Sequence, residues 1–481
     1  MLTPEFLENI PDNVVNLYAD LEIRILEDMA RRISKAGELT KTAQWQMWRL
    51  EQIVQEQEFI YYHLQRLTGK AQGEVNKILQ DAGEKALYYD DQIYRAAGLD
   101  PKNIQGNHKL KQEIRAGLEK TMQLFQNLTS TTANTATLQF ENALDAAYMD
   151  IVSGAFTYQD AIKSAVKSLS KDGINAIIYP TGHCDKMDVA VRRAVLTGIN
   201  QTAAKLSLAR MEEMDCDLLE TSAHPGARPS HAEWQGKIFS RSGKSSSYPD
   251  FVHSTGYGTG AGLCGWNCRH SFFPYFEGLS ERAYSYEKLR EYETAKVSYN
   301  GQKISVYKAT QQQRYIERQI RRWKREYMAM DAAGIDTTEA SVKLAEWRAR
   351  QKNFLFQTGL GEDNFRSQVY GFERSQATKA TWINKNYKKL ASDLQGMRTI
   401  TGITITDTSP HVMGQATVRG ISNSDVLDAL TNTLQTGKIR TDRSQQFVGE
   451  RATVVINVDT GKVVTTWPTS SKKANKLKGG L

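Results

Sequence analysis

Four histidines and two cysteines gather within residues 222–276 of this 481-residue chain. Cys264, Cys268 and His270 have the spacing Cys-x3-Cys-x-His, and thiolate and imidazole are ligands that tetrahedral zinc prefers. A fourth ligand would come from the other histidines of the stretch, which are His224, His231 and His253. Zinc-binding cysteine pairs more often have two residues between them. Buried structural Cys and His is therefore the favoured interpretation, with zinc at Cys264, Cys268 and His270 as the alternative.

The backbone of the same stretch is unsuited to regular helix. Five glycines lie between residues 256 and 265, and each costs about 1 kcal/mol against alanine inside a helix. Glycine instead permits the positive φ angles of compact loops. We therefore predict an irregular central module, with short strands, set into a chain that is otherwise mainly helical.

Three separated motifs occur in this part of the chain, at 224–239 (HPGARPSHAEWQGKIF), 265–270 (GWNCRH) and 307–325 (YKATQQQRYIERQIRRWKR). Together they resemble the tailed-phage minor capsid proteins related to the phage Mu head morphogenesis protein F. The resemblance covers roughly residues 1–370. It implies a structural component of a phage head, in which the Cys/His motif belongs to the fold and no catalytic residue is carried over.

A second resemblance covers most of residues 400–470. It rests on 409–422 (SPHVMGQATVRGIS), 446–449 (QFVG), 452–457 (ATVVIN) and 461–469 (GKVVTTWPT). These segments resemble the small nuclease toxins of the barnase–EndoU–colicin–RelE class, which occur fused behind Mu F-type modules. The resemblance implies a metal-independent ribonuclease, with no cofactor, an RNA substrate and an immunity protein as partner.

The residue types in those segments suit that chemistry. RNA cleavage without a metal needs a base for the 2′-hydroxyl, and His411 titrates in the right range. Cations must stabilise the charged phosphate, and the candidates are Arg419, Lys438 and Arg440.

Thr465 is the candidate to orient a phosphate oxygen from the last strand. Strand alternation puts Val463, Thr465 and Trp467 on one face and Thr466 on the other, and a one-residue change of register would reverse the choice. Alternatively His411 only caps or packs, and the cations are solvated. Residues 412–416 (VMGQA) also lack the charges that often follow this histidine in relatives, so an inactive or purely binding domain stays open.

Helices with apolar faces must position these groups. Residues 12–36 read as an amphipathic helix with Asp12 as N-cap and Gly37 as its end, and a second runs from Thr42 to Thr68 and closes at Gly69. Shorter helices follow near 74–98, 108–128 and 134–153, and another begins at Thr157. Residues 188–214 form a further helix, and 217–223 has strand character.

A basic helical hairpin is predicted at 308–358, with a break at Gly334. Its cations form either a solvated face with acidic partners or a contact with DNA phosphates. They are Arg314, Arg318, Arg321, Arg322, Lys324 and Arg325. The chain from Gly359 to about Asn386 is polar and predicts an irregular linker.

Beyond residue 397 the pattern becomes α+β. Residues 400–407 read as a strand and 424–434 as a helix capped by Asn423 or Ser424. The β-branched runs 452–458 and 462–467 flank Asp459-Thr-Gly461, which predicts a hairpin.

The composition is that of an ordinary globular protein, with 24% charged and 40% hydrophobic residues. A net charge of +8 permits contact with nucleic acid without requiring it. Four cysteines are too few for a disulfide scaffold, which favours a reducing cytoplasm. We expect no signal peptide and no membrane span.

The predicted fold class is mainly α, with an irregular α+β central module and a small C-terminal α+β domain. The expected domains are a helical region at 1–215, a Mu F-like module at 216–300, the basic hairpin at 301–358, a linker at 359–396 and a nuclease-like domain at 397–481.

The sequence therefore predicts a minor capsid or head morphogenesis protein that carries a ribonuclease-like C-terminal domain. We expect portal and other capsid proteins, and packaged DNA, as partners, and a virion location at the capsid interior or portal vertex after synthesis in the host cytoplasm. The first three quarters would be structural, so enzymatic activity rests on the C-terminal domain alone. Two alternatives remain: a secreted toxin that uses the Mu F-like region for delivery, and a structural protein with an inactive binding domain.

Overall fold

The protein is described by a computed structural model that covers residues 2–36, 42–178 and 181–479. Helices account for 61% of the chain, and the strands form small sheets. The predicted fold class, mainly α with a small C-terminal α+β region, is confirmed.

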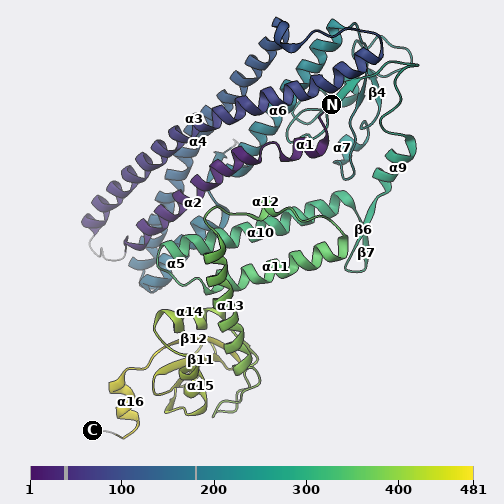
Figure 1. Cartoon of the computed structure of the whole chain (residues 1–481). Coiled ribbons are helices and arrows are strands. Elements are labelled where there is room, and N and C mark those ends of the chain that lie inside the picture. The colour runs from purple at the N-terminus through teal and green to yellow at the C-terminus, as the bar shows by residue number, and fades with distance from the viewer. Residues whose placement is uncertain (1, 37–41, 179–180, 480–481) are drawn as a thin grey trace.

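Long helices lie side by side in the upper body of the molecule (Figure 1). They are α2 (Asp12–Ser34), α3 (Thr42–Ala96), α4 (His108–Val152) and α6 (Met187–Glu213), with α5 (Tyr158–Asp172) packed against α4. The short helix α1 (Pro4–Asn9) begins at an N-cap provided by Thr3. The predicted start at Thr157 is confirmed, since its hydroxyl accepts from the Asp160 N–H. Asp12 opens α2 but the N-cap position belongs to Pro11, and the predicted end at Gly37 lies outside the described residues.

Helix α3 runs through the position where the sequence predicted an end. Gly69 and Gly73 lie inside it, and a Cβ at either would meet nothing within 4 Å. The buried stripe continues across them through Leu64, Ala71 and Val75. Burial of that stripe outweighs the helix-propensity cost of two glycines, about 1 kcal/mol each.

Helix α4 likewise replaces two predicted helices with one of 45 residues. Its middle is rich in threonine, which favours non-helical backbone because the hydroxyl competes for backbone hydrogen bonds. Here Thr129 and Thr137 donate to the carbonyls of Phe125 and Ala133, at 2.9 and 2.8 Å. These bonds point back along the helix, so the hydroxyls are satisfied without breaking it.

The central module is built on a three-stranded antiparallel sheet of order β4-β3-β5. The strands are β3 (Leu218–Thr221), β4 (Ile238–Ser240) and β5 (Phe272–Pro274), and β3 confirms the strand predicted there. Short helices α7 (Pro229–Ala232) and α8 (Phe251–Thr255) lie in the connecting loops. A two-stranded pair, β1 (Asn175–Ile178) and β2 (Cys184–Lys186), and the 3-10 turn η2 (Ile104–Gly106) complete this half.

The chain then crosses to a lower layer. Helix α9 (Tyr286–Thr294) and the hairpin β6 (Lys296–Tyr299) and β7 (Gln302–Ser305) lead into α10 (Val306–Ala332) and α11 (Thr338–Thr358), which confirm the predicted helical hairpin. The irregular linker predicted next is wrong in its local structure. It holds α12 (Asn364–Ser367) and the long helix α13 (Arg374–Leu394), which packs on α11 and leads to the C-terminal domain (Figure 1).

The C-terminal domain is a five-stranded sheet of order β8-β12-β11-β10-β9. Strands β11 (Ala452–Asn457) and β12 (Lys462–Pro468) confirm the predicted hairpin, and β9 (Gln435–Thr436) and β10 (Ser444–Val448) extend it. Residues 400–407 are mostly not strand, since β8 covers only Asp407–Thr408. Helix α14 (Pro410–Val418) packs on β12, and α15 (Asn423–Thr431), capped by Ser422, packs on β10 and β11. Helix α16 (Ser471–Leu477) follows the sheet.

Close packing of α4 on α6 depends on glycine. A Cβ at Gly117 would lie 2.1 Å from Thr202 Oγ1, and one at Gly198 would lie 2.3 Å from Thr121 Oγ1. We predict that Gly117→Ala lowers the free energy of unfolding by about 1–3 kcal/mol, because α4 must move away from α6. The matched change Gly73→Ala, where nothing lies within 4 Å, should raise it by about 0.5–1 kcal/mol. Helical circular dichroism during urea unfolding measures both, and an equal response of the two variants would contradict the packing argument.

Candidate functional site

Two predicted nuclease residues lie on one helix. His411 is half-buried in the first turn of α14, and Arg419 is exposed at its C-terminal end. Eight residues at 1.5 Å rise separate them by about 12 Å. Burial, and next Lys163, lower the pKa of His411, with Arg419 as a smaller cause. His411 is therefore neutral at neutral pH, as a general base must be.

The predicted strand alternation around Thr465 is interrupted. The β11–β12 register shifts between Val455 and Ile456, a bulge that places Val463 and Thr466 among the buried residues. Thr466 donates to the Thr453 carbonyl at 3.0 Å, whereas Thr465 is only half-buried. The prediction that Val463 and Thr465 share one face is therefore wrong, because the bulge buries Val463 together with Thr466 and leaves Thr465 half-buried. Thr465 stays a candidate contact for phosphate.

Lys438 and Arg440 are exposed in the loop between β9 and β10. Thr465 lies opposite Val455, Val455 opposite Gln446, and the Gln446 carbonyl accepts from Gly437 N–H. Three strand spacings therefore separate Thr465 from the start of this loop, roughly 14 Å. The structure does not bring Lys438 or Arg440 to the phosphate that Thr465 could contact.

The Cys/His stretch forms a buried cluster with different members from the predicted zinc set. Within the described part of the chain, His231, Cys268 and His270 have one potential ligand atom each within 4.8 Å of one another. Cys264 is buried but stands outside this group, with its thiol 3.7 Å from the His270 carbonyl. His253 is exposed on α8, and His224 only stacks its ring on that of His270, with centroids 4.6 Å apart.

A cavity of about 860 Å³ lies beside this cluster, between α2, α6, α10 and the segment around α12. Eight arginines and five carboxylates are among the residues that line it. The arginines are Arg192, Arg228, Arg269, Arg314, Arg318, Arg321, Arg325 and Arg366. The arginines of α10 were expected on an outer, solvated or DNA-binding face, whereas four of them line this cavity.

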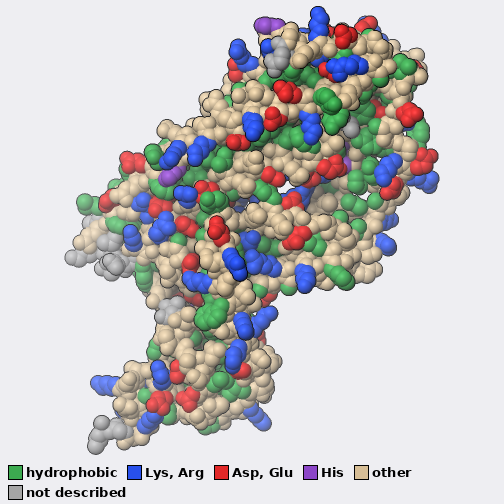
Figure 2. All heavy atoms as spheres, viewed as in Figure 1, with side chains coloured by type: hydrophobic (Ala, Val, Ile, Leu, Met, Phe, Trp, Pro, Cys, Tyr) green, Lys and Arg blue, Asp and Glu red, His purple; other side chains and the backbone are tan. Residues whose placement is uncertain are grey.

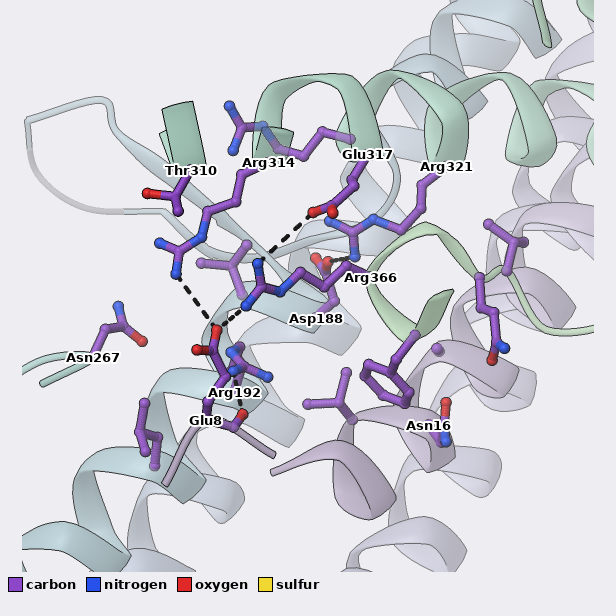
Figure 3. Close-up of a pocket in the computed structure, with 18 of the residues that line it drawn as sticks. Glu8, Asn16, Asp188, Arg192, Asn267, Thr310, Arg314, Glu317, Arg321 and Arg366 are labelled. Atoms are coloured by element: carbon purple, nitrogen blue, oxygen red, sulfur yellow. Dashed lines mark hydrogen bonds and ion pairs between the residues drawn. The ribbon is translucent and has the colours of Figure 1, made fainter. Parts of the chain in front are cut away.

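Glu8 is the carboxylate on which several of these arginines converge (Figure 3). Arg269 and Arg366 form ion pairs with it, and Arg314 Nη2 lies 3.7 Å from its Oε1. Arg192 donates to its backbone carbonyl at 2.5 Å. One carboxylate therefore faces guanidinium groups from the central module, α10 and α12. No local signal in the sequence marks Glu8 or Arg366, because their roles arise only from tertiary packing.

The cavity is electropositive. Burial, followed by the charges of Arg269 and Arg192, lowers the pKa of Arg314 to about 10. Burial and the nearby Asp363 raise the pKa of Glu317 to about 7. Its Oε2 lies 4.0 Å from Nη1 of Arg366. A carboxyl group that is half protonated near neutral pH carries only about half of a full negative charge. Arginines thus outnumber carboxylates in the lining, although most of them pair with Glu8, Asp188, Asp12 or Glu22.

The basic residues of α10 are mostly paired and not free for DNA. Arg321 pairs with Asp188, Arg322 with Glu326 at 2.7 Å, and Lys324 donates to the Ser367 carbonyl at 2.6 Å. On the face shown in Figure 2, acidic and basic side chains are interspersed. The predicted alternative, a face with acidic partners, describes α10 better than a DNA-binding face, although those partners are largely buried.

Comparison with known proteins identifies the family to which the chain belongs. The family model described as phage minor capsid protein 2 matches residues 2–356. The chain belongs to that family. The match ends at the C-terminal end of α11, so α13 and the C-terminal domain lie outside it. The prediction of a phage minor capsid protein is confirmed at this level.

Two phage relatives support the assignment. The minor capsid protein is 24% identical over 388 residues to a structural protein of Lactococcus phage LL-H, which covers 77% of this chain and 99% of the relative. It is 32% identical over 127 residues to a structural protein of Lactococcus phage mv4, covering 26% of this chain and 91% of the relative. No solved structure matches the chain.

The ion cluster at Glu8 generates a stability prediction for this minor capsid protein. Glu8→Gln should lower the free energy of unfolding by about 3 kcal/mol, because partly buried guanidinium groups lose their counter-charge. The control Glu58→Gln, on an exposed position of α3, should change it by less than about 0.5 kcal/mol. Sulfate can replace the carboxylate between guanidiniums, so it should raise the melting temperature of the Glu8 variant more than that of wild type. Equal behaviour of the Glu8 and Glu58 variants would show that the convergence on Glu8 contributes nothing.

Proposed function

We propose that this minor capsid protein is a head morphogenesis component of the virion that contacts the portal or a neighbouring capsid protein through one face of α3. Met47, Leu50 and Val54 recur at helical spacing and are 76%, 58% and 53% exposed. Large apolar side chains grouped on a surface mark protein–protein contacts. This exposed stripe is the observation that supports assembly into a larger particle.

The end of α4 extends the same surface. Trp45 of α3 stacks on Tyr148 of α4 with ring centroids 4.5 Å apart, so the two helices meet at this end. Met149 and Val152, next to Tyr148 on α4, are also exposed. A minor component of the capsid suits the single portal vertex better than the many equivalent positions of the shell, and this favours the portal as partner. Within the described residues, no helix is long and apolar enough to span a bilayer.

The assembly face is tested by adding charge to it. Leu50→Glu combined with Val54→Glu should reduce incorporation into gradient-purified particles at least about tenfold, because each buried apolar side chain contributes roughly 1.5–3 kcal/mol. The wild-type and variant genes are supplied to a phage that lacks the gene, and the protein is quantified per particle. The control Gln44→Glu with Gln46→Glu adds the same charge at exposed polar positions of α3. Normal incorporation of the Leu50/Val54 variant would exclude this face.

We further propose that the C-terminal domain is a metal-independent ribonuclease. It has its own hydrophobic core, which includes Val412, Phe447 and Ile456. Helix α14 packs on β12 and carries the half-buried His411, whose pKa is lowered by burial and by Lys163 of α5. His411 would accept the 2′-hydroxyl proton, and Arg419 and Thr465 would contact the phosphate. Lys438 and Arg440, across the sheet, would contact a more distant part of the RNA. An immunity protein would be an additional partner.

RNA cleavage by the purified full chain in EDTA tests this second function. His411→Ala should abolish it, whereas His253→Ala, an exposed histidine on α8, should leave it unchanged. His411 is half-buried near Lys163 of α5, so residues 374–481 are assayed in parallel. That fragment keeps α13, whose Leu390 and Leu394 belong to the same core. If neither folded protein cleaves RNA, the C-terminal domain is a binding domain and not a ribonuclease. Secretion of the chain, together with an immunity gene next to its own gene, would favour a delivered toxin.

A further inference from the structure

The buried cluster of His231, Cys268 and His270 brings three potential metal ligands together. His231 Nδ1 lies 3.4 Å from His270 Nδ1, and Cys268 Sγ lies 3.7 Å from each of these nitrogens. The three side chains are at most 2% exposed. The proton on each ring can be assigned from the contacts of the opposite ring nitrogen.

The tautomer of His231 follows from its other nitrogen. His231 Nε2 lies 2.9 Å from the Ala261 carbonyl oxygen. A carbonyl oxygen only accepts, so Nε2 carries the proton and donates. In a neutral ring, Nδ1 of His231 then presents a lone pair to the cluster.

The tautomer of His270 is fixed through Gln235. His270 Nε2 lies 3.2 Å from Gln235 Oε1, and the backbone N–H of His224 donates to the same oxygen at 3.1 Å. Because a backbone N–H requires an acceptor, the side-chain amide of Gln235 must be oriented with its oxygen at this point. His270 Nε2 therefore donates to that oxygen, and Nδ1 of His270 also presents a lone pair.

Two acceptor nitrogens thus face each other in a buried site. The Cys268 thiol has one proton and can satisfy only one of them. A metal cation accepts electron pairs from both nitrogens and from the sulfur.

We propose that His231, Cys268 and His270 bind a zinc ion. Tetrahedral zinc with bonds of about 2.0–2.1 Å to nitrogen and about 2.3 Å to sulfur places its ligands about 3.4 Å apart for N···N and about 3.6 Å for N···S. The observed separations are 3.4, 3.7 and 3.7 Å. Thiolate with imidazole suits zinc and not magnesium or calcium.

The surrounding contacts have the form of an outer shell around such a site. Each histidine donates its distal N–H to an oxygen, from Ala261 and Gln235, which orients the ring. The backbone N–H of His270 donates to Cys268 Sγ at 3.4 Å, a contact that stabilises a thiolate. His231, Cys268 and His270 also line the arginine-rich cavity, so water can supply a fourth ligand. The ion would join α7 to the loop before β5.

The metal content of the purified full chain tests the proposal. We expect about one zinc ion per chain after dialysis, with none in His231→Ala and Cys268→Ser. Cys216→Ser, a buried free cysteine outside the cluster, and Cys264→Ser should both retain it. Gln235→Ala should weaken zinc affinity about tenfold by releasing the His270 ring. Zinc lost from Cys264→Ser and kept by His231→Ala would overturn this ligand set, and bound copper would overturn the identity of the metal.

Cobalt replacement keeps the test independent of variant folding. Wild-type chain unfolded and refolded with Co²⁺ should show the visible bands of a tetrahedral site and a thiolate charge-transfer band. Zinc added to metal-free wild type should raise its melting temperature, and the same addition should leave folded His270→Ala unchanged. Wild type that binds neither zinc nor cobalt while keeping native circular dichroism would refute the site.

Discussion

The carboxylate of Glu8 is the interaction on which the arrangement of the layers depends. It contacts Arg269 of the central module, Arg314 of α10 and Arg366 of α12, while its carbonyl accepts from Arg192 of α6. Without a counter-charge, guanidinium groups at this separation repel one another in a partly desolvated cavity. Helix α1 has six residues and is too short to be stable alone. The ion pairs of Glu8 therefore stabilise both the position of α1 and the packing of the arginines against one another.

Local signals explain which parts of this fold were predictable. The Thr157 cap and the turn at residues 459–461 act within a few residues, and both elements formed as predicted. Gly69 carries an equally local helix-breaking signal, yet α3 continues because a buried stripe on both sides of it decides the outcome. The polar segment that forms α13 carries few buried residues, and those such as Leu390 pack into the C-terminal core, so its helical structure depends on tertiary contacts that no local pattern shows.

In the candidate sites, too, contacts between residues close in the sequence were predictable and contacts between distant residues were not. Cys268 and His270 are two residues apart, so their proximity follows from the sequence. His231 joins them across 37 residues through the β4-β3-β5 sheet, which spacing alone cannot reveal. Cys264 adopts a positive φ of 57°, in a tight turn that separates it from the cluster. In the C-terminal sheet a single bulge overrides the alternation used to choose Thr465.

The Glu8 ion cluster and the histidine cluster share one backbone segment. Asn200 of α6 donates its side-chain N–H groups to the carbonyls of Cys268 and His270, at 3.0 Å each. From this fixed segment, Cys268 and His270 point to His231, while Arg269 between them reaches Glu8. Alternation along an extended backbone sends neighbouring side chains to opposite sides. Cys268, Arg269 and His270 thus connect the two clusters. A displacement of α1 or of α6 would therefore move the proposed ligand atoms and the cavity wall together. This shared segment explains why the central module can be mostly loop and still hold both groups in place.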